Sequence, residues 1–300
     1  MNYADRLEAA VADKGNPCLV GLDPHLDLLP EEFASVQDPA ASRADVARDV
    51  TDFLLGILEA VADLVPAVKP QSAFFEQLGA PGIEAWERVV AAARHAGLLV
   101  IGDVKRGDIG STAAAYARAF LSGGPGADPA TLCDAITLNP YLGTDSVRPF
   151  LDACAEVGKG VYVLVRTSNP SSAEFQTHGE PALAERVAEA VVGWGADLVG
   201  DSGYSSVGAV VGATHPAELA RLRALMPHTP LLLPGYGAQG AGAADVVAGF
   251  DERGRGALVN SSRGILYAWR DRPGVGWREA ARDAAADMAA EIRAALAARA

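Results

Sequence analysis

Short apolar runs recur along the whole chain and alternate with longer amphipathic segments. Most runs are rich in Val and Leu and lack a polar residue at every second position, which is typical of parallel strands covered on both faces. They predict eight strands, at residues 18–23, 64–69, 98–105, 134–139, 161–167, 207–214, 229–235 and 256–262. The segments between them are Ala-rich and of helical length, for example DVARDVTDFLLGILEAVAD and GIEAWERVVAAARHAG.

Eight strands alternating with helices predict a (β/α)8 barrel, the TIM-barrel fold, with a doubly wound open sheet as the alternative. Such a barrel typically has about 250 residues. The 300 residues of this chain fit one barrel domain, 1–300, and contain no segment long enough to be a linker. The amphipathic segment before the first strand is expected to form a helix that caps the bottom of the barrel. Residues 168–180, SNPSSAEFQTHGE, form a polar insertion after the fifth strand and are a candidate lid.

The composition narrows the classes of partner. The chain carries 25 basic and 38 acidic residues, a net charge of −13. This charge argues against nucleic acid or an anionic membrane as a partner, but it leaves a small anionic ligand open. The three cysteines are widely spaced and do not indicate a disulfide framework. No apolar run approaches the roughly 18 residues of a membrane span, and the N-terminal segment lacks the apolar centre of a signal peptide. We therefore expect a soluble, cytoplasmic protein.

Polar residues gather where the predicted strands end. In a (β/α)8 barrel these ends and the loops that follow them form the active site. The residues at these positions are Asp23, Lys69, Asp103, Lys105, Asn139, Thr167, Ser168, Pro234, Ser261, Ser262 and Arg263. A single charged residue at the end of a strand usually just meets solvent. The whole set converging on one rim is better explained by a functional site, in which Asn139 is a candidate for orienting a lysine or aspartate side chain.

The stretch IGDVKRGDIGSTA, residues 101–113, ends an apolar strand with charged residues. Asp103 and Lys105 are two apart and should point to the same face of the strand. Asp108 lies past the Arg-Gly turn and could reach the same pocket from another direction or from another subunit. At about 4 Å and an effective dielectric near 20, each attractive pair is worth roughly 4 kcal/mol before desolvation.

Such carboxylates keep Lys105 protonated, as a cation that suits a developing carbanion rather than a Schiff base. The alternative is an ion pair between Lys105 and Asp103 that merely closes the mouth of the barrel.

Residues 235–240, GYGAQG, match the pattern G-x-G-x-x-G after a strand. A dinucleotide site would need this turn early in the chain and an acidic residue about 20 positions later. Barrels often bind phosphate with the loops after the seventh and eighth strands. Here the glycines would let backbone N–H groups approach an anion, Gln239 adds a donor and Arg263 adds a bidentate cation. The motif predicts a phosphate site, with an ordinary turn as the alternative. The five histidines show no metal-ligand spacing, so no metal is expected.

These residues together resemble a known set. The pattern D-x-K-x-x-D followed by I-x-x-T, formed by Asp103, Lys105, Asp108, Ile109 and Thr112, resembles the hallmark of the orotidine 5'-phosphate decarboxylase family and its wider barrel superfamily. Five further segments resemble family motifs in the same order: GLDPH, AVKPQSAFFE, RTSNP, LLLPGYGAQGA and NSSRGILYA. The length of the chain and its TSNP and SSRGI segments are similar to the longer bacterial subgroup.

The resemblance implies a cofactor-free decarboxylation of orotidine 5'-phosphate, giving uridine 5'-phosphate and CO2 in pyrimidine synthesis. It implies that Asp23 holds a ribose hydroxyl, and that Lys69 bonds the ribose and orients Asp103. Asp103 would lie against the substrate carboxylate. Lys105 would stabilise the carbanion at C6 and protonate it after CO2 leaves.

The resemblance also implies a homodimer with shared active sites, because Asp108 and Thr112 would come from the partner subunit. Ser168 would contact the pyrimidine, although the adjacent Thr167 is an equal candidate by position. The resemblance places three more residues against the substrate: Pro234, Gln239 and Arg263. Gln239 and Arg263 would grip the 5'-phosphate.

Three alternatives remain at this stage. Sugar-phosphate decarboxylases and synthases of the same superfamily share D-x-K-x-x-D, but resemble one another in placing an acidic residue and a magnesium ion at the end of the second strand, where this chain has Lys69. A non-catalytic protein that binds a phosphate ligand would leave the lysine–aspartate array unexplained. A Schiff-base aldolase would need a neutral amine at Lys69 or Lys105.

Overall fold

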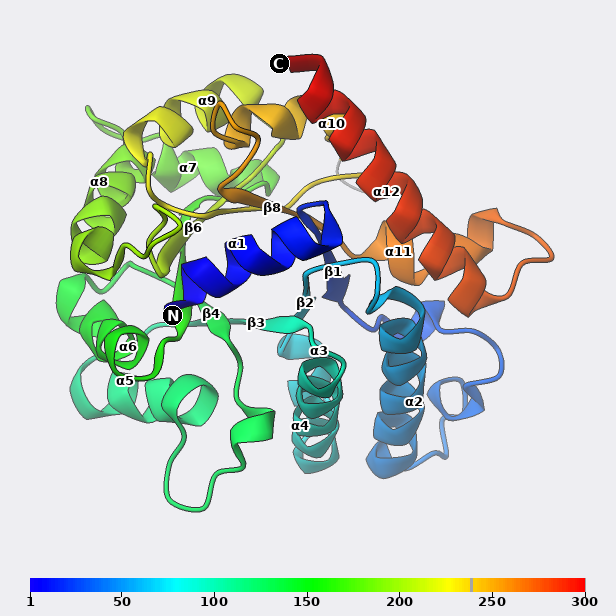
Figure 1. Ribbon diagram of the computed structural model, residues 1–300. Helices are drawn as coiled ribbons and strands as arrows, with labels where there is room; N and C mark the ends of the chain where they lie inside the picture. Colours follow the sequence, from blue (N-terminus) through cyan, green and yellow to red (C-terminus); the bar gives the residue numbers. More distant parts are fainter. Residues whose placement is uncertain (238–239, 300) are drawn as a thin grey trace.

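The computed structural model describes residues 1–237 and 240–299, and its centre is a closed barrel of parallel strands (Figure 1). Each strand pairs with the next one along the chain, and the last pairs with the first. The strands are β1 (Cys18–Leu22), β2 (Ala67–Pro70), β3 (Leu99–Arg106), β4 (Ala135–Leu138), β5 (Gly160–Arg166), β6 (Val207–Val211), β7 (Leu231–Leu233) and β8 (Ala257–Ser261). The predicted (β/α)8 barrel is confirmed. The doubly wound sheet is wrong, because an open sheet would leave β1 and β8 unpaired.

Each predicted range overlaps one of these strands, but the ladder of β2, β6 and β7 covers less of the range than predicted. Val65 and Ala213 are fully buried although they lie outside the ladder. Burial therefore extends beyond the residues that form sheet hydrogen bonds. An apolar run shows what is buried and does not show where pairing stops.

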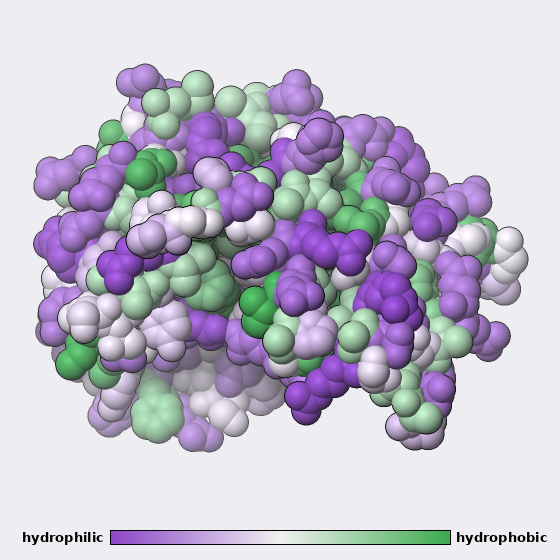
Figure 2. All heavy atoms as spheres, turned by 90° about the horizontal axis from the view of Figure 1, so that it is seen from below, coloured by the Kyte–Doolittle hydropathy of each residue, from purple (hydrophilic) through white to green (hydrophobic). Residues whose placement is uncertain are grey.

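Helices surround the barrel (Figure 1). They are α1 (Tyr3–Lys14), α2 (Arg43–Val61), α3 (Ala73–Glu76), α4 (Ala80–His95), α5 (Gly110–Ala117), α6 (Thr144–Val157), α7 (Ala173–Gln176), α8 (Leu183–Gly195), α9 (Pro216–Leu225), α10 (Ala243–Val246), α11 (Arg263–Leu266) and α12 (Trp277–Arg299). Local sequence sets several ends: Ser42 and Asp45 form a capping box at the start of α2, and Gly15, with a φ of 64°, ends α1. Among the described residues, no helix combines the length and apolarity needed to cross a membrane. The side of the molecule in Figure 2 is mainly polar, with apolar residues scattered over it.

The strands bury side chains on two faces. Outward-facing residues such as Val20 and Val100 join the large cluster between sheet and helices. Inward-facing residues form a second cluster inside the barrel, which contains Tyr3, Leu7, Leu19, Ala67, Ile101, Ala135, Tyr162, Val210, Leu232 and Leu258. This alternation explains why the strands read as continuous apolar runs, since neither face meets water.

The N-terminal helix α1 lies across one end of the barrel (Figure 1). Its Tyr3 and Leu7 belong to the interior cluster, and the Tyr3 and Tyr162 hydroxyls lie 3.1 Å apart. A Cβ on Gly160, the first residue of β5, would come within 2.3 Å of the Tyr3 ring. Helix α1 thus closes the end where the strands begin, which confirms the predicted cap at the bottom.

A buried carboxylate fixes this cap. Asp134 Oδ1 accepts hydrogen bonds from Arg6 of α1 at 2.7 Å and from Arg94 of α4 at 2.9 Å, and Oδ2 accepts from the Val100 N–H at 3.0 Å. Burial by itself would raise the pKa of Asp134, but the bonds from Arg6 and Val100 and the charge of Arg94 outweigh it and hold the pKa below its usual value. The group is ionised in the folded protein and links α1 to the barrel.

We predict that Asp134→Asn lowers the free energy of unfolding at pH 7 by about 3 kcal/mol, because two arginines lose their shared buried partner. Since the folded pKa is depressed, the stabilisation is present above the unfolded pKa of about 4 and is lost as the pH falls through the folded value. Urea unfolding between pH 7 and pH 3 should therefore show the two proteins converging toward low pH. Asp152→Asn, on the exposed face of α6, is the control. A difference that does not depend on pH would contradict the ionic role.

Candidate active site

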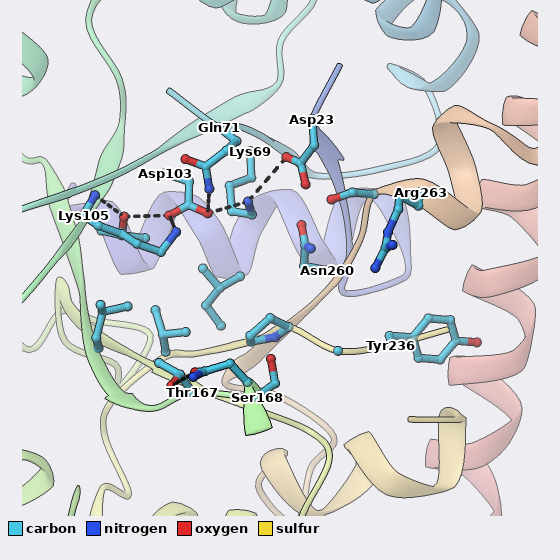
Figure 3. Close-up of a pocket in the computed structure, with 18 of the residues that line it drawn as sticks. Asp23, Lys69, Gln71, Asp103, Lys105, Thr167, Ser168, Tyr236, Asn260 and Arg263 are labelled. Carbon is cyan, nitrogen blue, oxygen red and sulfur yellow. Dashed lines mark hydrogen bonds and ion pairs between the residues drawn. The ribbon is translucent and has the colours of Figure 1, made fainter. Parts of the chain in front are cut away.

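A cavity of about 750 Å³ lies at the opposite end of the barrel from α1, where the strands end. Nine of the strand-end residues predicted from sequence line it: Asp23, Lys69, Asp103, Lys105, Thr167, Ser168, Pro234, Ser262 and Arg263. Figure 3 shows the lysines and Asp103 on one side, Arg263 at another side, and Thr167 and Ser168 across the cavity. The structure therefore brings together residues from six different strand ends, as the barrel predicts.

The Asp103 carboxylate is the centre of a hydrogen-bonded array. Oδ2 accepts from Lys69 Nζ at 2.7 Å and from Gln71 Nε2 at 2.9 Å. Oδ1 accepts from Lys105 Nζ at 2.6 Å and from Thr137 Oγ1 at 2.9 Å. Burial would raise the pKa of Asp103, but the charges of the two lysines and their hydrogen bonds hold it well below its usual value. Asp103 is a carboxylate at any physiological pH.

Lys69 sits at the inner side of the array, with 6% of its side chain exposed. Burial would lower its pKa, but Asp103 and Asp23 outweigh this effect and raise it. The Lys69 ammonium lies 3.9 Å from Asp23 Oδ1. Lys69 is therefore a buried cation between two acids, and it cannot supply the neutral amine that a Schiff base needs.

Lys105 faces the open part of the cavity, with 47% of its side chain exposed. Its φ of 45° makes it the one non-glycine residue with a left-handed backbone in the described parts of the chain. The register between β3 and β4 shifts here, and the Lys105 N–H donates to Thr137 Oγ1 at 2.9 Å. A left-handed conformation of this kind costs about 1–3 kcal/mol and concentrates at functional sites. The side chains of Asp103 and Lys105 meet as predicted, but through this bulge rather than through regular strand geometry.

Two residues of the array were missed from sequence. Gln71 is two positions beyond Lys69 and on the same face, so period-two spacing could have indicated it. Thr137 stands inside the apolar strand β4, where an isolated threonine carries little signal. The suggestion that Asn139 orients the array is wrong, because its side chain is exposed and its Oδ1 accepts from the Tyr141 N–H at 3.1 Å.

Tyr267 ties the loop after β1 to the segment after β8. Its hydroxyl donates to the Asp23 carbonyl at 3.0 Å and accepts from the His25 N–H at 2.7 Å. The same helical segment begins at Arg263, so the hydroxyl fixes the position of Asp23 relative to this arginine. The His25 ring packs against Phe74, with 4.6 Å between ring centroids, and completes this wall.

The insertion at 168–180 folds as a short 3-10 turn and α7 against the end of β5. Gln176 Oε1 accepts from the Thr167 N–H at 2.8 Å, and its Nε2 donates to Thr167 Oγ1 at 2.8 Å. The buried Arg166 donates to Ser172 and, at 2.6 Å, to Glu218. Thr167 and Ser168 both line the cavity, so their order of importance stays open. The insertion forms a wall of the cavity, and its movement as a lid stays a prediction.

The remaining side of the cavity suits an anion. Arg263 is exposed and forms no ion pair with any residue in 1–237 or 240–299. Gly235, Gly237 and Gly240 have φ values of 105°, 72° and 93°, in the left-handed region where glycine is favoured, and these three positions carry no side chain. The predicted contact of Gln239 lies outside the described residues.

Asp108 and Thr112 stand apart from the cavity in this single chain. Asp108 Oδ1 accepts from the Ile109 N–H at 2.7 Å, and Thr112 is exposed on α5. Neither residue lines the cavity that holds Lys69, Asp103 and Lys105. One chain thus assembles only part of the predicted site.

Other reactive groups of the protein lie elsewhere. All three cysteines are buried and unpaired, and burial raises the pKa of each thiol to about 12, which leaves little thiolate at neutral pH. Within the ranges 1–237 and 240–299, no three His, Cys, Asp or Glu side chains are placed to hold a metal ion. The titratable groups that line the described part of the cavity are the acids and lysines above, with His25, Tyr236 and Arg263.

Comparisons with a family model, with curated proteins and with solved structures all indicate the same family. A model of the orotidine 5'-phosphate decarboxylase / HUMPS family matches residues 42–273. Orotidine 5'-phosphate decarboxylase of Rhodopirellula baltica is 47% identical over 272 residues, 89% of each chain, and that of Deinococcus radiodurans is 47% identical over 250 residues, 83% of each. A crystal structure from Streptomyces avermitilis ascribed to the same enzyme has a TM-score of 0.81 and 39% identity, covering 99% of this chain and 96% of that one. The chain belongs to the orotidine 5'-phosphate decarboxylase / HUMPS family.

Proposed function

We propose that this protein converts orotidine 5'-phosphate to uridine 5'-phosphate and CO2, a step of pyrimidine synthesis. The observation that carries the proposal is the array of Lys69, Asp103 and Lys105 at the end of the cavity, with two cations held on one carboxylate. The curated relatives support the same substrate, because they are orotidine 5'-phosphate decarboxylases at 47% identity.

The array fits the chemistry of this reaction. When the bond between C6 and the carboxylate breaks, CO2 leaves and the electron pair remains on C6, where no carbonyl is positioned to delocalise it simply. The Lys105 ammonium, held at 2.6 Å from Asp103, stabilises that pair by its charge and then donates a proton to C6. The neutral amine regains its proton from solvent. No cofactor is needed in this scheme.

Asp103 positions the proton donor. Its carboxylate is ionised and accepts from four donors, so the Lys105 side chain is held in one place before the substrate arrives. Such preorganisation matters because a charge already in position does not have to reorganise during the reaction. Asp103 also faces the part of the cavity where the substrate carboxylate would lie, next to Lys105.

The rest of the nucleotide would be held along the same cavity. Asp23 Oδ1 is buried without a hydrogen-bond partner, which suits a ribose hydroxyl, and Lys69 lies beside it. Arg263 and the glycine-rich loop would bind the 5'-phosphate, with Gln239 a predicted further donor. Ser168 or Thr167, with Pro234, would line the pyrimidine. Phosphate contacts distant from C6 supply binding energy that can close the insertion and exclude water.

We also propose a homodimer in which Asp108 and Thr112 of each subunit complete the site of the other. The support is their position outside the cavity of their own chain. Apolar side chains stand exposed on the loops after β3 and β4, where Ile109, Tyr141 and Leu142 are 54%, 87% and 47% exposed. A dimer interface would cover such residues. The cytoplasmic location and the bacterial subgroup stay predictions.

The activity assay is the most direct test. Purified protein treated with a chelator should convert orotidine 5'-phosphate to uridine 5'-phosphate. Chromatography of the nucleotides measures this conversion. Full activity after chelation is expected because Lys69 occupies the place where metal-dependent superfamily members have an acid. Activity that returns only with magnesium would favour the sugar-phosphate chemistry, and absence of turnover would refute the proposal.

Lys105→Ala should lower kcat by at least about 10³-fold, because one residue supplies both the stabilising charge and the proton. The fold should persist, since Asp103 keeps three of its four donors. Circular dichroism and single-turnover kinetics measure the two effects. Lys14→Ala, at the end of α1, is the control. Substantial turnover by a folded Lys105→Ala protein would contradict the proposed role of Lys105 as the proton donor.

The shared site can be tested by mixing two inactive variants. Lys105→Ala and Asp108→Ala chains should each be nearly inactive. In an equal mixture about half of the dimers are hybrids, and one of the two sites in each hybrid is intact. The mixture should therefore recover about a quarter of wild-type activity. Native mass spectrometry measures the hybrids and the kinetic assay measures recovery. Hybrids without any recovered activity would show that Asp108 does not act across subunits.

A further inference from the structure

Asn260 occupies the floor of the cavity on the inward face of β8. Leu258, two residues earlier on the same face, belongs to the apolar interior of the barrel, so Asn260 is the first polar side chain above that layer. It is 9% exposed and lines the cavity. Figure 3 shows it between the group formed by Asp23 and Lys69 and the side chain of Arg263, with no interaction drawn to it.

The Asn260 amide oxygen has no hydrogen-bond partner among the described residues. This atom, Oδ1, is buried, and no hydrogen bond within residues 1–237 or 240–299 reaches it. Buried polar atoms are nearly always hydrogen-bonded, because losing water without gaining a partner is unfavourable. A leucine in this place would extend the apolar layer without that cost. The polar atom therefore points to a ligand that supplies the missing donor.

The neighbouring strand β1 has a glycine where it passes the Asn260 amide. A Cβ on Gly21 of β1 would lie 3.0 Å from Asn260 Oδ1 and 1.9 Å from Ser262 Oγ. The glycine thus leaves room for the side chains of Asn260 and Ser262. Two residues after Gly21, the Oδ1 atom of Asp23 is another buried acceptor that has no hydrogen bond from the described residues. Two acceptors without donors therefore lie at the ends of the paired strands β1 and β8.

We propose that Asn260 is a further substrate-binding residue, whose amide oxygen accepts a hydrogen bond from a ribose hydroxyl beside Asp23. This inference rests on the proposed function, which places the reacting carbon near Lys105 and the phosphate near Arg263. Asn260 lies between these two ends. A phosphate and the pyrimidine carbonyls only accept hydrogen bonds, and the pyrimidine's N3–H donor belongs to the ring assigned to Ser168 or Thr167 and Pro234. The ribose between the phosphate and the pyrimidine offers hydroxyl donors to two acceptors side by side.

Asn260→Ala and the similarly sized Asn260→Leu test the contact through its dependence on the sugar. Values of kcat/KM are measured for orotidine 5'-phosphate and for its 2'-deoxy and 3'-deoxy analogues. Both variants should lose about tenfold on the ribonucleotide, the effect of one buried hydrogen bond left unmade. They should equal the wild type on the analogue that lacks the contacted hydroxyl. Asn2→Ala, at the start of α1 and at the closed end of the barrel, should match the wild type on all three substrates.

Two further measurements separate binding from packing. Calorimetric binding of uridine 5'-phosphate and its two deoxy analogues should show the same pattern without turnover. The melting temperature of ligand-free Asn260→Leu should equal or exceed that of the wild type, because the unpaired polar atom has been removed. An equal loss on all three nucleotides, together with a lower melting temperature, would overturn the proposal in favour of a packing role. Failure of the wild type to decarboxylate orotidine 5'-phosphate would instead refute the proposed function.

Discussion

The carboxylate of Asp103 accepts hydrogen bonds from four side chains, and two of them are ammonium groups. The charge of Lys69 could not lie at this depth alone, since an unpaired buried ion is strongly destabilising. Asp103 neutralises Lys69, which is deeply buried, and fixes Lys105, which faces the cavity. The geometry of the site therefore depends on one carboxylate staying ionised, and the same two lysines keep its pKa low.

The barrel separates the groups that hold the protein together from the groups that meet the substrate. Along β3, Ile101 lies in the apolar interior, Asp103 is the next inward residue, and Lys105 reaches the open cavity. At the other end, Asp134 ties α1 to the barrel through Arg6. Each strand thus changes from apolar to polar along its length. The loops can supply chemistry while the closed end supplies stability.

Polar atoms without hydrogen-bond partners indicate where a ligand would bind. Asp23 and Asn260 line the cavity, and each has a buried acceptor oxygen without a hydrogen bond from the described chain; Arg263 has no ion pair there. Asp108 and Thr112 lie outside that cavity. A nucleotide would supply the missing donors and the anion, and a second subunit would bring the last two residues. The unliganded single chain therefore retains unsatisfied groups that binding can satisfy.

The sequence by itself determined that the sheet is parallel and covered by helices on both faces, because eight apolar runs alternate with amphipathic segments. Closure into a barrel rather than an open sheet was decided by the pairing of β1 with β8. The two-residue spacing also predicted that Asp103 and Lys105 would meet, but the bulge at Lys105 brings them together rather than regular strand geometry. Only the tertiary structure decided which side chains surround them. Thr137 and Gln71 reach Asp103 from neighbouring strands, Asn139 turns outward and Asn260 turns inward. The physical reason is that spacing along a strand sets the face of a side chain, whereas contacts across strands depend on register, on the bulge at Lys105 and on barrel closure.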